Sequence, residues 1–114
     1  LLALVLLGLF LPPSIVLAQT TPSAEKIKIL IAYHSRGGHT AAMAKAVAEG
    51  AKKNPLAEIS VKPVGEVKCA ELLATDALIV GSPVYWSNMA GEVKTFFDRF
   101  STDCGVLPPA FQMR

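Results

Sequence analysis

The stretch Lys28 to Lys53, KILIAYHSRGGHTAAMAKAVAEGAKK, combines three patterns that together decide the fold. Residues 28–33 are a short, nearly continuous apolar run, which is typical of a strand buried on both faces of a sheet. From Thr40 to about Lys53, apolar side chains recur at helical spacing, and many are alanines that let a helix lie close to a sheet. The polar segment HSRGGHT separates these two regions. The stretch therefore predicts a strand, a loop and a helix, with Thr40 as the helix N-cap.

Further patterned segments follow along the chain. Residues 58–63, EISVKP, alternate apolar and polar side chains and predict a half-buried edge strand. Residues 76–82, DALIVGS, are an apolar run that predicts a third, buried strand. Residues 64–74 predict a short helix around ELLA, and residues 83–90 predict a loop. Residues 91–101 predict a helix whose apolar side chains fall at helical spacing: Val93, Phe96, Phe97 and Phe100.

Strands that alternate with helices predict an α/β fold with a parallel sheet and right-handed crossovers. Three strands are few for this class, so the pattern indicates an incomplete sheet. We expect the 114 residues to be part of a longer protein. At this length the chain holds at most one domain, expected to begin at Ile27.

The N-terminal residues have a different composition. Residues 1–11 are apolar with no charge, which fits the h-region of a signal peptide, predicted over residues 1–18 and without its basic start. Residues 19–26 are a polar linker. The alternatives are a retained membrane anchor, which Pro12 and Pro13 would interrupt, and a buried helix. The expected location is exported, periplasmic or secreted, with membrane anchorage as the alternative.

Charge and cysteine content narrow the functional classes. The net charge is +2 and the basic residues are scattered, so we expect no nucleic acid partner. Cys69 and Cys104 can pair in an oxidising compartment, and their spacing fits no metal motif. Two unpaired thiols are the interpretation that the sequence favours.

Two loops follow the carboxyl ends of the expected strands, where open α/β sheets bind ligands. In the first, residues 34–40, a helix start offers free N–H groups, and Gly37 and Gly38 allow a close approach to a phosphate. The alternative is an ordinary turn. In the second loop, Tyr85 and Trp86 can flank a flat ligand, while Asn88 can bind a polar ring edge. The alternative is that these rings pack on the sheet or join a homo-oligomer.

Titratable side chains near these loops can either contact a ligand or be ordinary surface residues. His34 and His39 can bond a phosphate or relay a proton, but such histidines are more often partly exposed loop residues. Asp98 and Arg99, late in the last helix, are interpreted as solvated surface. The two loops together indicate a site for a mononucleotide with a planar ring.

The motifs S-x-x-G-x-T, at Ser35 to Thr40, and GSPVYWSNMAGEVKTFFD resemble the FMN-dependent NAD(P)H:quinone oxidoreductases of the flavodoxin-like fold. This resemblance covers about residues 27–100 and implies a doubly wound parallel sheet with strand order 2-1-3, incomplete as given. It implies that one loop seats the FMN phosphate and that the other lines the isoalloxazine ring. The implied cofactor-binding residues are Ser35, Arg36, Gly37, Gly38, His39, Thr40, Pro83, Val84, Tyr85, Trp86, Ser87 and Asn88.

The resemblance implies a reaction in which the flavin takes electrons from NAD(P)H and passes them to a quinone-type acceptor. Two alternatives stay open: a flavodoxin-like electron carrier, and a fragment that no longer binds flavin. The carriers that the chain resembles are typically acidic, whereas this chain is basic. The chain departs from the family pattern in three ways: at Gly37, in its apparent signal peptide, and in lacking the last two strands with the third flavin-contacting loop.

Overall fold

The computed structural model describes residues 24–105, so the predicted signal peptide and most of the predicted linker lie outside the described residues. Three parallel strands form the sheet: β1 (Ile27–Tyr33), β2 (Ala57–Pro63) and β3 (Ala77–Gly81), in the order β2-β1-β3. The predicted α/β class and strand order are therefore confirmed. The edge position predicted for the second strand is also what the described residues show.

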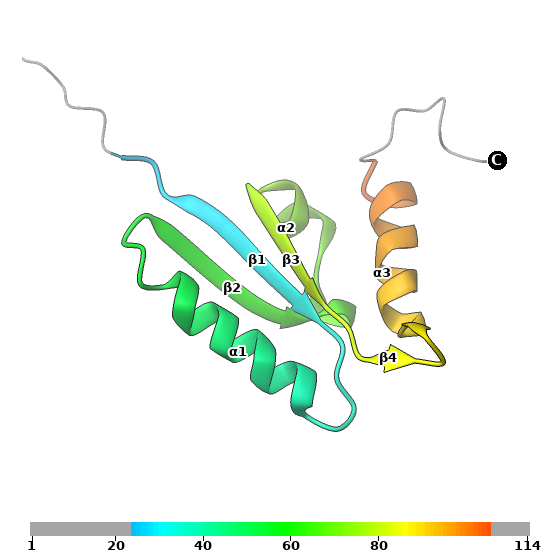
Figure 1. Cartoon of the computed structure of the whole chain (residues 1–114). Coiled ribbons are helices and arrows are strands. Elements are labelled where there is room, and N and C mark those ends of the chain that lie inside the picture. Colours follow the sequence, from blue (N-terminus) through cyan, green and yellow to red (C-terminus); the bar gives the residue numbers. More distant parts are fainter. Residues whose placement is uncertain (1–23, 106–114) are drawn as a thin grey trace, which may run out of the picture.

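Helices cover both faces of the sheet (Figure 1). Helix α1 (His39–Ala51) lies on one face, where Ala44 and Ala48 pack against Ile31. A short 3-10 turn, η1 (Val64–Glu66), and helices α2 (Cys69–Leu73) and α3 (Gly91–Thr102) lie on the other. The core between the sheet and this second group of helices contains eight buried residues: Leu30, Ala32, Val64, Val67, Leu72, Ala90, Val93 and Phe96. Side chains of β1 alternate between the two cores because successive residues of a strand point to opposite faces.

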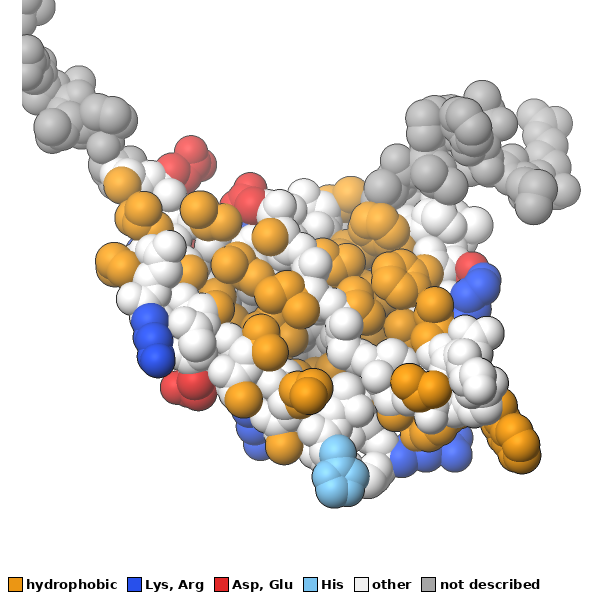
Figure 2. All heavy atoms as spheres, viewed as in Figure 1, with side chains coloured by type: hydrophobic (Ala, Val, Ile, Leu, Met, Phe, Trp, Pro, Cys, Tyr) orange, Lys and Arg blue, Asp and Glu red, His pale blue; other side chains and the backbone are white. Residues whose placement is uncertain are grey.

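The prediction that the third strand is buried is wrong for the described residues. β3 pairs only with β1, and Ile79 is 40% exposed. Phe97 on α3 and Val47 on α1 are exposed as well, and Figure 2 shows apolar side chains gathered between these two helices. Within the part of the chain that the structure describes, the apolar run of β3 therefore lacks the cover that its sequence indicates, and no strand pairs with its outer edge.

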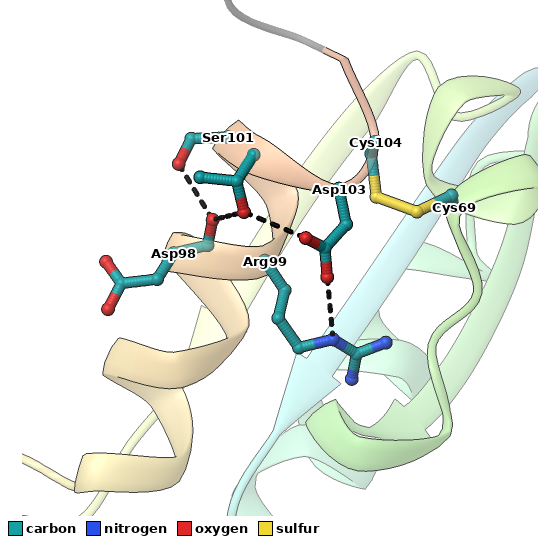
Figure 3. Close-up of a disulfide and its surroundings, with 7 residues drawn as sticks. Cys69, Asp98, Arg99, Ser101, Asp103 and Cys104 are labelled. Carbon is teal, nitrogen blue, oxygen red and sulfur yellow. Dashed lines mark hydrogen bonds and ion pairs between the residues drawn. A yellow bond between two sulfur atoms is a disulfide. The ribbon is translucent and has the colours of Figure 1, made fainter. Parts of the chain in front are cut away.

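A disulfide joins Cys69, at the start of α2, to Cys104, just beyond α3 (Figure 3). The S–S distance is 2.07 Å and the Cα atoms are 5.2 Å apart. The favoured prediction of two unpaired thiols is therefore wrong. The cysteines are 35 positions apart in the sequence, which hides their proximity, because α2 and α3 meet only once both have packed on the same face of the sheet.

The described residues contain no helix that is both long enough and apolar enough to cross a membrane. They also contain no cluster of three or more metal-ligating side chains.

Candidate functional site

The loop from β1 to α1 turns into the helix through Gly38. Gly38 has φ 87° and is the helix N-cap, and its N–H donates to Ser35 Oγ over 3.1 Å. The predicted N-cap, Thr40, lies inside the first turn of α1, so that prediction is wrong. The physical reason is that the chain enters the helix in a left-handed conformation, which glycine adopts without strain. Gly37 has no such requirement, since an added Cβ would meet only His39 at 3.6 Å.

This loop presents donors that fit an anion. The Ala42 N–H is the first to bond back along the helix, to Gly38 O over 2.9 Å. Within the described residues, the N–H groups of His39, Thr40 and Ala41 therefore make no hydrogen bond. The Ser35 hydroxyl accepts from Gly38 and keeps its own hydrogen free to donate. Free N–H groups at a helix start together with a hydroxyl are a suitable donor set for phosphate.

The predicted loop at residues 83–90 is a tight hairpin. Strands β4 (Val84–Tyr85) and β5 (Asn88–Met89) pair antiparallel around Trp86 and Ser87, both of which have positive φ. Turns of this kind usually contain glycine or asparagine at these two positions, and so the sequence did not indicate a hairpin. Trp86 is fully exposed at the tip, whereas Tyr85 packs against the core.

Two polar side chains of the hairpin region form hydrogen bonds with nearby backbone groups. The Asn88 side-chain oxygen accepts from the Met89 N–H over 2.8 Å. Ser82 holds the base of the hairpin, because its hydroxyl accepts from the Ala90 N–H over 3.0 Å and donates to Pro83 O over 2.8 Å. This role of Ser82 was missed, and its only signal is its position directly after a strand.

The structure brings the two loops together at the carboxyl ends of β1 and β3 (Figure 1). The His34 N–H donates to Gly81 O over 3.0 Å, and a Cβ added at Gly81 would lie 3.2 Å from the Thr40 methyl group. The Arg36 guanidinium lies 5.9 Å from the centre of the Tyr85 ring. A cavity of about 460 Å³ lies here, lined by Arg36, Val84, Tyr85 and Trp86. Among the first-loop residues predicted for the site, only Arg36 lines this cavity.

A second cavity, of about 820 Å³, lies between the first loop, η1 and α3. Glu92 Oε1 is 3.4 Å from an Arg36 Nη, and Glu92 Oε2 is 3.5 Å from His34 Nε2. The backbone N–H of Glu92 itself, then His34 and Arg36, lower the pKa of the Glu92 carboxyl. The His34 side chain is only 17% exposed, and among residues 24–105 its buried Nε2 finds no hydrogen-bond partner.

Sequence reasoning missed this second cavity and interpreted Arg99, which lines it, as surface. The available signal was the helical spacing of Glu92, Thr95, Phe96 and Arg99, which places a carboxylate, a hydroxyl, a ring and a guanidinium on one side of α3.

Comparison with known proteins identifies the family to which these elements belong. A family model described as a flavodoxin domain matches residues 30–112. The chain belongs to this family. A solved structure of a flavodoxin from the domain Archaea is 30% identical, with a TM-score of 0.62, over 65% of this chain and 51% of that one. Oxidised Flavodoxin 2 from Bacillus cereus is 30% identical, with a TM-score of 0.48, over 62% of this chain and 49% of that one.

The chain therefore spans about half the length of these two flavodoxin structures. In this flavodoxin-family chain, the Gly38 helix start and the Arg36–Tyr85 contact lie at the carboxyl edge of the sheet, where ligands of such sheets bind.

Proposed function

We propose that this protein is an FMN-binding oxidoreductase that passes electrons from NAD(P)H to a quinone-type acceptor. The observation that carries the proposal is the helix start at Gly38, with its free N–H groups, beside the cavity between Arg36 and the hairpin. Membership of the flavodoxin domain family supports a flavin as the ligand.

The loop and the hairpin would hold different parts of FMN. The N–H groups of His39 and Thr40 and the hydroxyls of Ser35 and Thr40 would hold the phosphate, and Gly38 allows the loop to turn toward it. Tyr85 and Trp86 would flank the ring, since both stand beside the hairpin cavity. Arg36, poised over Tyr85, would add positive charge near the phosphate. When bound, FMN supplies the hydride and electron chemistry.

Flavin retention tests the phosphate seat. The full chain is mixed with FMN and desalted, and the retained visible absorbance is measured. A Ser35→Ala, Thr40→Val double variant removes both hydroxyls but keeps the methyl group of residue 40, which would lie 3.2 Å from a Cβ added at Gly81. We expect its affinity for FMN to fall about tenfold or more, since hydrogen bonds to a charged group are each worth roughly 1.5–3 kcal/mol. Thr102→Val, at the far end of α3, is the matched control.

Absence of FMN from the desalted wild type would refute the flavin assignment, and unchanged affinity in the double variant would refute the seat. If flavin is retained, NADPH oxidation with a quinone acceptor separates the enzyme from an electron carrier. No oxidation above the FMN-free background would leave the carrier as the function.

We also propose that the protein works in an oxidising compartment, because a disulfide such as Cys69–Cys104 persists there and is rare in the cytosol. Alkylation of the protein isolated from its native host without reductant tests this. Resistance of both cysteines to alkylation until reductant is added is the expected result, and immediate labelling would contradict it.

A further inference from the structure

Glu92 stands against the loop that is proposed to seat the FMN phosphate. It belongs to the first turn of α3, which begins beside the hairpin at the carboxyl edge of the sheet (Figure 1). Its Oε1 lies 3.4 Å from an Arg36 Nη, and its Oε2 lies 3.5 Å from His34 Nε2. Glu92, Ser35 and Arg36 also line the same cavity. Because Ser35 lies between His34 and Arg36 in the sequence, the carboxylate is held next to a residue of the seat.

Glu92 places a negative charge where the proposed ligand brings another. It is the only carboxylate among the described residues that line this cavity. The backbone N–H of Glu92 itself, then His34 and Arg36, lower the pKa of this carboxyl, so the group is ionised at neutral pH. A guanidinium binds a carboxylate and a phosphate through the same N–H groups. Arg36 therefore faces two competing anions when FMN is bound.

The surroundings of Arg36 allow it to change partners. The Arg36 side chain is 75% exposed and the Glu92 side chain is 43% exposed, so packing holds neither of them tightly. The other contact of Arg36 is with the Tyr85 ring, whose centre lies 5.9 Å away. A phosphate does not compete for the face of a ring. The exposure also limits the effect on affinity to a few-fold, because exposed ion pairs contribute little free energy.

We propose that Glu92 is a specificity-determining residue of the flavin site. Its carboxylate competes with the phosphate of the ligand for Arg36, and it thereby weakens binding in proportion to the charge on that phosphate. The site consequently distinguishes FMN from unphosphorylated riboflavin less strongly than the Gly38 helix start and Arg36 would without Glu92. This inference deepens the proposed function and rests on its phosphate seat.

Three flavins of different charge test the competition in the full chain. At pH 8 riboflavin is neutral, riboflavin 4′,5′-cyclic phosphate carries one negative charge, and FMN carries two, since the second pKa of a phosphate monoester is about 6. Quenching of flavin fluorescence at low ionic strength measures each affinity where salt screens least. We expect Glu92→Gln to bind the cyclic phosphate about twofold and FMN about fourfold more tightly than the wild type, because a Coulomb energy is proportional to the ligand charge. Riboflavin should bind both proteins equally.

Asp98→Asn is the matched control. Asp98 is an exposed carboxylate of the same helix, paired with Lys94 and outside the cavity lining, so its loss changes the net charge equally. We expect this variant to bind all three flavins like the wild type. An equal gain of FMN affinity in both variants would reduce the effect to net charge and overturn the proposal. Weaker FMN binding by Glu92→Gln would also overturn it, because Glu92 would then hold the loop in place rather than compete with the ligand.

A double-mutant cycle separates competition for Arg36 from direct repulsion between Glu92 and the phosphate. In the Arg36→Gln protein, no guanidinium is set free when the carboxylate is removed. We therefore expect Glu92→Gln to raise the FMN affinity of that protein by less than about twofold. A gain as large as in the wild-type background would show that Glu92 acts on the phosphate without Arg36, and would refute the competition.

Titration with inorganic phosphate, followed through the amide NMR signals of Gly38 and His39, separates this inference from the proposed function. Phosphate needs only the seat, so Glu92→Gln should bind it about fourfold more tightly than the wild type. This gain in a protein that retains no FMN would contradict the flavin assignment and support the competition. Equal phosphate affinities in a protein that retains FMN would contradict the competition alone. Absence of phosphate binding to either protein would overturn both the seat and the competition.

Discussion

The two faces of the sheet are built in different ways. On one face, α1 packs its small side chains, Ala44 and Ala48, against the strands. On the other face, α2, α3 and η1 pack larger side chains such as Phe96 and Leu72, and a disulfide joins α2 to Cys104, just beyond α3. β1 supplies both faces with neighbouring residues, since Leu30 and Ile31 are each 1% exposed and point to opposite sides.

The difference reflects distance along the chain. α1 follows β1 after a loop of only a few residues, so its packing closes a short loop at a small entropic cost. The opposite face gathers segments from residue 64 to residue 104, so more chain must be ordered before its contacts form. We therefore expect the α1 face to depend on close fit, and the opposite face to depend on bulk and on its crosslink.

Loss of the crosslink should have the largest effect. A Cys69→Ala, Cys104→Ala variant should lose about 4 kcal/mol of unfolding free energy, because a loop of this length is no longer closed in the unfolded chain. Urea unfolding followed by far-UV circular dichroism measures this, and the reduced wild type should give a similar loss. A variant as stable as the oxidised wild type would show that packing alone holds α2 and α3 together.

A cavity in the core of the α3 face should come next. Leu30→Ala removes a fully buried side chain and should cost about 3 kcal/mol. Ile79→Ala, on the half-exposed β3, serves as the comparison and should cost about 1 kcal/mol, because less apolar surface leaves water on folding. Equal losses in the two variants would mean that β3 is covered in solution.

The close fit of the α1 face is tested by enlarging a side chain. Ala48 is 2% exposed against the sheet, so Ala48→Leu should cost about 2 kcal/mol through overpacking. Ala46→Leu introduces the same side chain at an exposed position of the same helix and should be nearly neutral. If both variants unfold at the wild-type urea concentration, α1 is not closely packed.

The short connection to α1 can be tested at its adjacent glycines. Gly38→Ala should cost about 1 kcal/mol, because φ 87° strains any residue with a Cβ. At Gly37 the same substitution meets only ordinary contacts and should leave the unfolding midpoint unchanged. A larger loss of stability in Gly37→Ala than in Gly38→Ala would contradict Gly38 as the helix start.

The smallest expected effect concerns the ion pair between Lys62 on β2 and Glu71 on α2. Lys62 donates to Glu71 over 2.8 Å, and this bond lowers the pKa of Glu71. A lowered folded-state pKa gives stability that is present above the unfolded-state pKa and is lost as pH falls through the folded-state pKa. We expect this pair to contribute about 0.5 kcal/mol to the free energy of unfolding at neutral pH, since both side chains are partly exposed. Urea titrations of wild type and Glu71→Gln from pH 7 downward should converge at acidic pH; a constant gap would contradict this.

Much of the fold was predictable because local patterns determine it. The apolar run of β1 and the alanine spacing of α1 predicted the strand–loop–helix unit, and the alternation of elements predicted the parallel sheet. What was missed depends on tertiary structure or on unusual backbone. The cysteine pairing needed two helices on one face, and the hairpin at Trp86 and Ser87 uses positive φ at residues that rarely adopt it.

The same holds for the site. The sequence indicated two ligand-facing loops because each follows an apolar run, and the structure places Arg36 against Tyr85. The sequence did not indicate Gly38 as the helix N-cap, since Thr40 has the type of side chain that usually caps a helix. The cavity along α3 was missed because Arg99 is exposed and resembles ordinary surface until the neighbouring loop and η1 are in place.

The hairpin tip also determines what a fluorimeter reports on this protein. Trp86 is the only tryptophan in the chain, and it is fully exposed. Its emission should therefore resemble that of tryptophan in water in both the folded and the unfolded protein, and be a poor signal for unfolding. The same indole stands beside the hairpin cavity, so a ring that stacks there should quench it. Trp86 fluorescence thus reports on ligands at the hairpin and hardly at all on the packing of the core.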